Sequence, residues 1–218
     1  MTHTYHELLD IPDNIDIVVH SGDFTNAKDV YKNEPEALNF LHWYGSLPIK
    51  NKVLIAGNHD AYTFHMKTKF KEWCVHYNIV YLENSYAEIE GIKFFGSPNT
   101  PQFGDWYYMK DRNKMDKLWR QCNNDIDVFV VHGPPKGILD KSYDRNHNLE
   151  CCGDSSLYNH IVRINPKLCL FGHIHDNNDI INQGTFKMST METIFSNGSV
   201  VKDRKFGVLS SNGNIFEI

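Results

Sequence analysis

The stretch Val53-Leu54-Ile55-Ala56-Gly57-Asn58-His59-Asp60 joins a run of four apolar residues to a glycine and three polar side chains. A short, unbroken apolar run is typical of a strand that is buried on both faces, as in a sheet that other layers cover. Gly57 permits a sharp turn of the backbone. The stretch therefore predicts that Asn58, His59 and Asp60 lie together at the carboxyl end of a buried strand.

Three other segments of the chain repeat this plan of an apolar run followed by glycine and a polar side chain. The strands expected at 15–19, 128–131 and 168–171 lead to Ser21-Gly22-Asp23, His132-Gly133-Pro134-Pro135 and Gly172-His173-Ile174-His175. A single strand end of this kind is usually only a turn, a helix cap or a buried histidine. Four of them together indicate one metal site that is assembled at a common edge of the fold.

Length, charge and cysteine usage narrow the class of protein. The chain has 218 residues, which is enough for a core without disulfides, and we expect one domain over residues 1–218. A net charge of −5 gives no basic footprint for nucleic acid, and no apolar run approaches the length of a membrane span. Five cysteines without paired spacing favour reduced thiols in a cytoplasmic protein. Nothing in the sequence indicates an oligomeric state.

The remaining segments predict a mixture of helices, short strands and one long loop. Helices are expected at 33–45, 64–77, 110–121 and 157–164, a hairpin at 86–89 and 92–95, and short strands at 193–195, 206–209 and 215–217. The segment 96–109 is aromatic and rich in turn residues, and a loop of this length is often functional. Trp106 in this loop has two open interpretations, which are stacking on a base and packing of the loop itself.

The side chains at the strand ends are suited to a pair of divalent cations. One carboxylate, that of Asp23, has two oxygens and can bridge two ions about 3.5–4 Å apart. Asn58 offers an amide oxygen, and His132, His173 and His175 offer imidazole nitrogens. Ligation by nitrogen and oxygen without thiolate favours two ions of Mn²⁺, or of Fe²⁺ or Zn²⁺, over Ca²⁺.

Such a pair of ions predicts chemistry on phosphate esters. Two metal ions that share a hydroxide lower the pKa of the attacking water and neutralise charge on the phosphoryl oxygens. His59 directly follows Asn58 and is expected to give a proton or a hydrogen bond to the leaving oxygen. Asp60 is expected to hold the imidazole of His59 and raise its basicity.

In order and in spacing, the four strand-end motifs resemble the successive signatures of the calcineurin-like metallophosphoesterases. Two further segments resemble the metallophosphoesterase-domain branch related to the 239AB brain proteins, namely 96–106 and 132–140. The resemblance covers nearly the whole chain. It implies an α/β fold, a four-layer α/β/β/α sandwich, with two metal ions at the carboxyl ends of the central strands.

The resemblance also implies roles for individual side chains. Asp23 would bridge the two ions. One ion would be completed by Asn58, His132 and His173. The other ion would be bound by His3 and His175, together with an aspartate that opens the family's first motif, Asp-x-His.

The start of the chain departs from this family pattern. Thr2-His3 match the end of Asp-x-His, but Met1 stands where the aspartate belongs, and the strand that should precede it is absent. We therefore expect that the authentic protein begins several residues upstream. In the chain as given, we expect weak occupancy of the metal site that His3 serves, or occupancy by a single ion, because a terminal residue tends to fray.

Two classes of function remain. The first is an enzyme that hydrolyses small phosphate esters, with phosphodiesters such as cyclic nucleotides favoured over phosphomonoesters and phosphoproteins. The second is a catalytically weak member that binds a nucleotide or a partner, which the missing aspartate favours. A cysteine-based phosphatase is disfavoured, because no cysteine is followed by a glycine-rich phosphate loop and an arginine.

Overall fold

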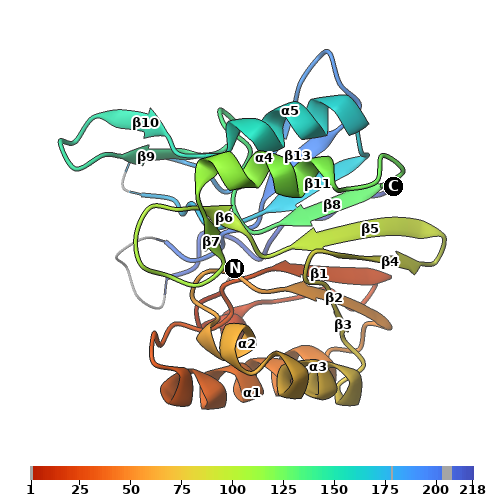
Figure 1. Cartoon of the computed structure of the whole chain (residues 1–218). Helices are drawn as coiled ribbons and strands as arrows, with labels where there is room; N and C mark the ends of the chain where they lie inside the picture. The colour runs from red at the N-terminus through yellow and green to blue at the C-terminus, as the bar shows by residue number, and fades with distance from the viewer. Residues whose placement is uncertain (1, 178, 203–207) are drawn as a thin grey trace.

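The computed structural model of the chain describes residues 2–177, 179–202 and 208–218. Two β-sheets lie face to face, and a layer of helices covers the outer face of each sheet (Figure 1). This arrangement confirms the predicted four-layer α/β/β/α sandwich. Among the helices of the described segments, none is both long and apolar enough to cross a bilayer.

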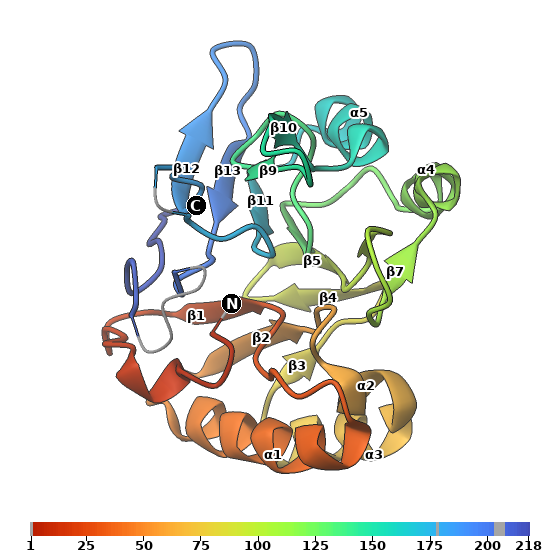
Figure 2. The ribbon, with the colours of Figure 1, turned by 90° about the vertical axis from the view of Figure 1, so that its left-hand side faces the viewer.

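The first part of the chain forms the smaller sheet and its helices. Strands β1 (Ile17–Ser21), β2 (Asn51–Ile55) and β3 (Val80–Tyr81) are parallel in the order β1-β2-β3. Its outer face is covered by α1 (Val30–Ser46), α2 (Ala61–His65) and α3 (Lys67–His76), as Figure 2 shows. Residues 2–16 contain a single 3₁₀ turn, His6–Leu8, and the strand expected at 15–19 is β1, which begins two residues later at Ile17.

The larger sheet has six strands in the order β12-β13-β11-β8-β5-β4. The four inner strands are parallel, and the two outer strands pair with them antiparallel. In chain order the six strands are β4 (Ser85–Ile89), β5 (Ile92–Ser97), β8 (Val128–Val131), β11 (Leu168–Phe171), β12 (Gly184–Lys187) and β13 (Ile194–Asn197). Its outer helices are α4 (Arg112–Arg120) and α5 (Ser155–Ile164).

Two small strand pairs lie outside these sheets. The parallel pair is β6 (Thr100–Pro101) and β7 (Met109–Lys110), and the antiparallel hairpin is β9 (Lys141–Tyr143) and β10 (Leu149–Cys151). The hairpin extends away from the body of the sandwich (Figure 1). None of these four strands was expected from the sequence, since none has a continuous or alternating apolar pattern.

Alternation of side chains along the central strands separates the interior into three layers of core. In β2, Leu54 packs against the layer of α1, whereas Val53 and Ile55 pack between the two sheets. In β8, Phe129 belongs to the core under α4 and α5, whereas Val130 lies between the sheets. Both faces of these strands are buried, which explains why their sequences are continuously apolar.

Several predicted boundaries shift for identifiable reasons. The helix expected from residue 33 begins at Val30, because the Asp29 carboxylate accepts hydrogen bonds from the amides of Tyr31 and Lys32 at 3.1 Å and caps the helix there. The helix expected at 64–77 is two helices, α2 and α3, since Met66 between them has non-helical angles of φ −114 and ψ 41.

The predicted C-terminal strands are only partly present. The strand expected at 193–195 is β13, whereas the one expected at 206–209 lies partly outside the described residues, and its residue Leu209 makes an isolated bridge to Val201. The prediction of a strand at 215–217 is wrong. The side chain of Asn214, rather than a strand backbone, donates hydrogen bonds to the carbonyls of Gly184 and Asn197.

We predict that Asp154 is a major stabilising residue of the outer helical layer. It accepts hydrogen bonds from the buried indole of Trp119 at 2.7 Å and from the amide of Ser156 at 2.9 Å, so it both pairs Trp119 and caps α5. Asp154→Ala should lower the free energy of unfolding by about 2–4 kcal/mol, because a helix cap and a buried hydrogen bond are lost together. Urea denaturation measures this change.

The matched control is Ser155→Ala at the exposed first residue of α5, which should change stability little. In the double variant with Trp119→Phe, the losses should be less than additive, since each single change breaks the same hydrogen bond. Additive losses would contradict this account.

Candidate metal centre

The predicted ligands meet where the carboxyl ends of strands from both sheets come together. Asp23 follows β1, Asn58 follows β2, His132 follows β8, and the histidine pair of the Gly172–His175 segment follows β11. His3 reaches the same place because the amides of Thr2 and His3 donate to the Asp23 carbonyl at 3.1 and 3.0 Å. All six predicted ligands therefore lie in one cluster.

One group of candidate metal ligands combines Asp23 with histidines from the larger sheet. One ligand atom from each of Asp23, His132 and His173 lies within 4.8 Å of the other two. His132 Nε2 is also 2.9 Å from Asn58 Oδ1 and 3.2 Å from Asp23 Oδ2. Nitrogen and oxygen atoms from both sheets thus converge on one point.

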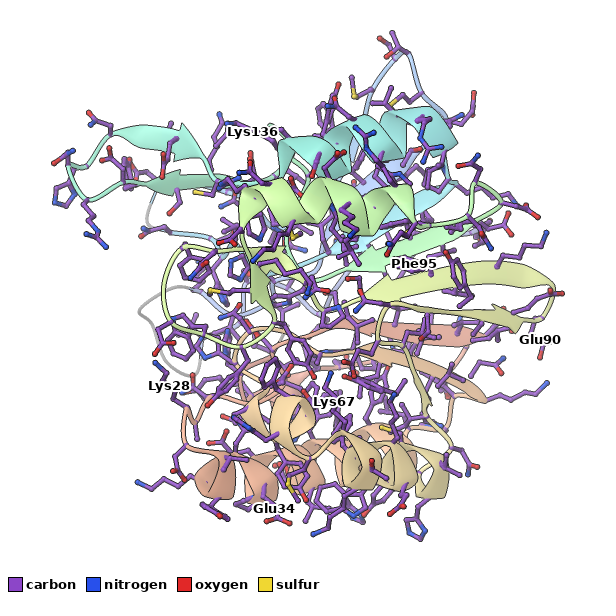
Figure 3. All side chains as sticks on the ribbon, viewed as in Figure 1. Lys28, Glu34, Lys67, Glu90, Phe95 and Lys136 are labelled. Atoms are coloured by element: carbon purple, nitrogen blue, oxygen red, sulfur yellow. The ribbon has the colours of Figure 1, made fainter. Side chains whose placement is uncertain are left out.

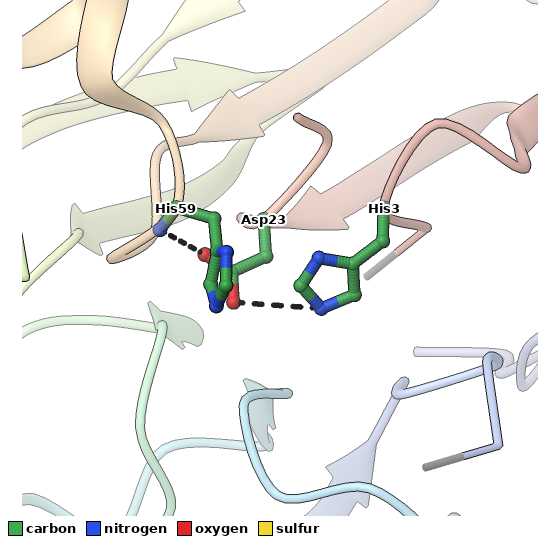
Figure 4. A group of neighbouring side chains, drawn as sticks. All are labelled: His3, Asp23 and His59. Carbon is green, nitrogen blue, oxygen red and sulfur yellow. Dashed lines mark hydrogen bonds and ion pairs between the residues drawn. The ribbon is translucent and has the colours of Figure 1, made fainter. Parts of the chain in front are cut away.

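A second group combines Asp23 with His3 and His59 (Figure 4). His3 Nε2 is 3.8 Å from Asp23 Oδ2 and 3.1 Å from His175 Nε2. Asp23 belongs to both groups, which is the arrangement that a bridging carboxylate requires. His59, expected to face the leaving group, is the third member of this group.

The hydrogen bonds of the histidines fit the binding of cations. The Ser21 carbonyl lies 2.9 Å from His132 Nδ1, and the Val201 carbonyl lies 2.6 Å from His175 Nδ1. A carbonyl can only accept, so each Nδ1 carries the proton, and in the neutral ring Nε2 presents a lone pair. The lone pair of His132 then faces two oxygens, and that contact is favourable only with a proton or a cation between the atoms.

Burial sets the protonation of the other two candidate histidines. Burial, against the attraction of Asp23, lowers the pKa of His3 to about 3. Burial and the nearby His132 hold the pKa of His173 well below its ordinary value. Both rings are therefore neutral at pH 7, which is the form that binds a metal ion.

Three of the predicted ligands have strained backbones. The φ angles of His3, Asp23 and His173 are 43°, 52° and 71°. These angles lie in the left-handed region, which residues other than glycine rarely adopt. Such conformations cost on the order of 1–3 kcal/mol each and concentrate at functional sites, where surrounding contacts hold them. The strain is consistent with side chains placed for binding rather than for packing.

The predicted contact between Asp60 and the imidazole of His59 is wrong. The buried Asp60 carboxylate instead accepts from the amides of Asp23, Phe24 and Thr25 at 2.8, 3.1 and 3.0 Å. It also accepts from the Thr25 hydroxyl at 2.7 Å and the Gly57 amide at 2.6 Å. Burial and the Asp23 charge raise the pKa of Asp60 to about 7 against these hydrogen bonds. Asp60 therefore fixes the loops that carry the ligands.

Aromatic rings, rather than a carboxylate, hold the imidazole of His59. The ring centroid of Trp106 lies 4.2 Å from that of His59. The ring centroid of His3 lies 4.7 Å from it, and these two rings meet edge to face. Asn33, which the sequence did not indicate, donates to the His59 carbonyl at 3.0 Å. The structure gives Trp106 a contact that neither interpretation anticipated, with the ring of His59, and stacking of Trp106 on a base stays a prediction; Tyr108 of the same loop is buried.

Beside the cluster is a cavity of about 1060 Å³. It is lined by Asp23, Asn58 and His173 of the cluster, by Trp106, and by residues of the hairpin of β9 and β10. A cavity of this size is large for a small ligand site. The candidate metal ligands therefore open onto space for a substrate.

Comparison with known proteins agrees with this geometry. The family model described as Calcineurin-like phosphoesterase matches residues 2–177. This chain belongs to the calcineurin-like phosphoesterase family. Membership confirms the resemblance of the four strand-end motifs, and it makes a pair of metal ions the expected content of a site with these side chains.

Curated relatives place this calcineurin-like phosphoesterase in the predicted branch. Metallophosphoesterase domain-containing protein 1 of Homo sapiens is 30% identical over 207 residues, covering 84% of this chain and 61% of that protein. UPF0046 protein C25E10.12 of Caenorhabditis elegans is 32% identical over 211 residues, covering 89% of this chain and 70% of that protein. The chain spans 61% to 64% of the length of the first curated relatives it matches.

A solved structure supports the fold. The crystal structure of TT1561 of Thermus thermophilus matches with a TM-score of 0.58 and 12% identity, covering 91% of this chain and 82% of that one. At this identity the likeness concerns the fold alone.

We predict that Gly57→Ala disrupts the candidate metal centre. A Cβ atom at Gly57 would lie 2.4 Å from both Asp23 Oδ1 and His132 Cε1, so these ligands must move. We expect the affinity for Mn²⁺ to fall by at least about tenfold, as when residues that orient metal ligands are altered. Isothermal titration measures the affinity.

The control is Gly104→Ala, whose Cβ would meet only the ring of Trp106 at an ordinary 3.5 Å. Equal metal affinity in the two variants would contradict the prediction.

Proposed function

We propose that this chain is a metal-dependent phosphoesterase that prefers phosphodiesters, with Mn²⁺ as its preferred metal. The observation that carries the proposal is that Asp23 belongs to both groups of candidate ligands, in the lining of a cavity of about 1060 Å³. A shared carboxylate between two sets of nitrogen ligands suits a pair of divalent ions. Such ions, when bound, supply Lewis acidity to a phosphoryl group.

The side chains divide between two ion positions in this proposal. Asn58, His132 and His173 would hold one ion with Asp23, and His3 and His175 would hold the other with Asp23. The first position has four candidate ligands and the second has three. Neutral imidazoles and amide and carboxylate oxygens suit Mn²⁺, Fe²⁺ and Zn²⁺.

His59 is the proposed donor to the leaving group. Its ring lies beside Asp23 but is held by Trp106, and its Nδ1 has no hydrogen-bond partner among the described residues. An imidazole at the cavity wall with a nitrogen to spare can give a proton or a hydrogen bond to a departing oxygen. The size of the cavity supports a diester, because a diester brings two organic arms to the phosphorus.

A catalytically weak binding protein is the second candidate function. The observation that favours it is the imbalance of the two ion positions, since His3 and His175 share Asp23 without a further carboxylate in the described part of the chain. A weakly held second ion would permit binding of a phosphate ester without efficient hydrolysis.

We predict hydrolysis of bis(p-nitrophenyl) phosphate with added Mn²⁺. Asp23→Ala should abolish it, because both ion positions lose a ligand. His59→Ala should lower kcat by about 10²–10⁴-fold, the usual contribution of a general acid. The control is His42→Ala, an exposed histidine on α1, which should keep the full rate. Release of p-nitrophenol measures each rate, and a normal rate in Asp23→Ala would refute the assignment.

We also predict that two Mn²⁺ ions bind with unequal affinity. His173→Ala should weaken the tighter binding event, because it removes one of four ligands, and His175→Ala should weaken the looser event. Calorimetric titration separates the two events. Two equal sites in the unaltered chain would contradict the imbalance and, with it, the second candidate function.

A further inference from the structure

The cavity of the candidate metal centre has a second, positively charged part that the proposed reaction does not use. Besides the metal cluster, its lining contains five cationic side chains and two acidic ones. The cations are Arg112, Lys136, Lys141, Arg145 and Lys202, and the acids are Asp144 and Glu150. This excess contrasts with the net charge of −5 of the whole chain.

In the part of the chain that the structure describes, none of these five cations forms an ion pair. Within residues 2–177, 179–202 and 208–218, the ion pairs involve other lysines and arginines, such as Lys50 with Glu90 and Lys114 with Asp111. The acidic Asp144 is occupied in the hairpin turn, where it accepts from the amides of Asn146 and Asn148 at 2.8 Å. Five cations against Asp144 and Glu150 leave this part of the lining with a net charge of +3, which is available to a ligand in the cavity.

Hydrogen bonds hold parts of three of these cations in place, namely the side chain of Arg112 and the backbones of Lys136 and Lys141. Arg112 donates from its guanidinium to the carbonyls of Gly153 and Cys152 at 3.0 and 3.1 Å, which leaves three of its five N–H donors for other partners. The amide of Lys136 donates to the Asp154 carbonyl at 3.1 Å. Figure 3 places Lys136 beside the base of the hairpin of β9 and β10.

The third cation, Lys141, is joined to the metal centre through one buried residue. Asn182 accepts from the Lys141 amide at 2.9 Å and donates to the carbonyls of Lys141 and His175, both at 2.9 Å. One side chain thus fixes the first residue of β9 relative to a candidate metal ligand. This connection holds the backbone from which the Lys141 side chain projects at a defined place beside the metal centre.

We infer that Arg112, Lys136 and Lys141 form a second anion-binding subsite, which receives a phosphate or carboxylate carried by one arm of the substrate. The inference rests on the proposed function for the first phosphoryl position. It narrows the substrate class to phosphate esters that bear a further anionic group remote from the scissile bond. Charge-assisted hydrogen bonds from an arginine fork and two lysines give such a group both affinity and orientation.

The test compares matched ligands that differ only in the second anion. Alkanediol bisphosphates with about four to ten carbons are titrated against the Mn²⁺-loaded chain, beside alkyl monophosphates of the same lengths. The best bisphosphate should bind at least about tenfold more tightly than its monophosphate, the gain of one good charged contact. A bisphosphate that binds no tighter at any length would overturn the inference.

Charge-reversal variants test whether the tighter binding of the bisphosphate depends on Lys136 and Lys141. In Lys136→Glu with Lys141→Glu, the bisphosphate should lose its advantage to within about twofold, whereas the monophosphate is unchanged. The control is Lys71→Glu with Lys117→Glu, which makes the same change in net charge at exposed positions on α3 and α4 that do not line the cavity. An advantage retained in the first double variant would also overturn the inference.

Phosphoalkanoates of the same lengths distinguish the two sources of the anion. Equal affinity with the bisphosphates supports a subsite for either anion, and weaker binding supports a phosphate subsite. These titrations measure binding and not turnover. If bis(p-nitrophenyl) phosphate is not hydrolysed, the proposed function fails, but the titrations still test the subsite. If the diester is hydrolysed and the bisphosphates bind no tighter, the subsite fails and the proposed function stands.

Discussion

The buried carboxylate of Asp60 is the constraint on which the candidate site depends. Its five hydrogen bonds join the amides of residues 23–25 and the hydroxyl of Thr25, after β1, to the amide of Gly57, after β2. The left-handed backbone of Asp23, with φ 52, is held in this way. An ordinary hydrogen bond contributes about 0.5–1.5 kcal/mol, so five together offset the cost of about 1–3 kcal/mol for one strained residue. Without Asp60 the shared carboxylate would have no fixed position.

The layered fold supplies the rest of the geometry. β1 and β2 are parallel in one sheet, and β8 and β11 are parallel in the other, so each sheet presents a row of strand ends. The sheets pack through residues such as Val53 and Val130, which lie between them. That packing brings His132 from one sheet to within 2.9 Å of Asn58 from the other. The candidate centre thus exists because two sheets, rather than one, end at the same place.

The sequence predicts the parts of this structure that depend on local patterns. Continuous apolar runs identified β2, β8 and β11, and the glycines and polar residues that follow them identified the candidate ligands. The hydrogen-bond partners of Asp60 could not be predicted from the sequence. A carboxylate can accept from an imidazole or from backbone amides, and the amides of Asp23, Phe24 and Thr25 are 35 to 37 residues away in the chain. The hairpin of β9 and β10 was missed because its residues are mostly exposed and polar, and its turn is formed by Asp144.

The two groups of residues that line the cavity differ in charge. The centre contains the buried carboxylate of Asp23, and the rings of His3 and His173 are neutral, so these groups do not attract an anion by themselves. Cations bound there would reverse the sign of the local charge and make the centre a position for a phosphoryl group. The far part of the cavity, with Arg112, Lys136 and Lys141, is positive whether or not cations are bound. A substrate with a remote anion would therefore be attracted both at the hairpin and at the loaded centre, and the hydrogen bonds of Asn182 hold the backbone of Lys141 close to that of His175.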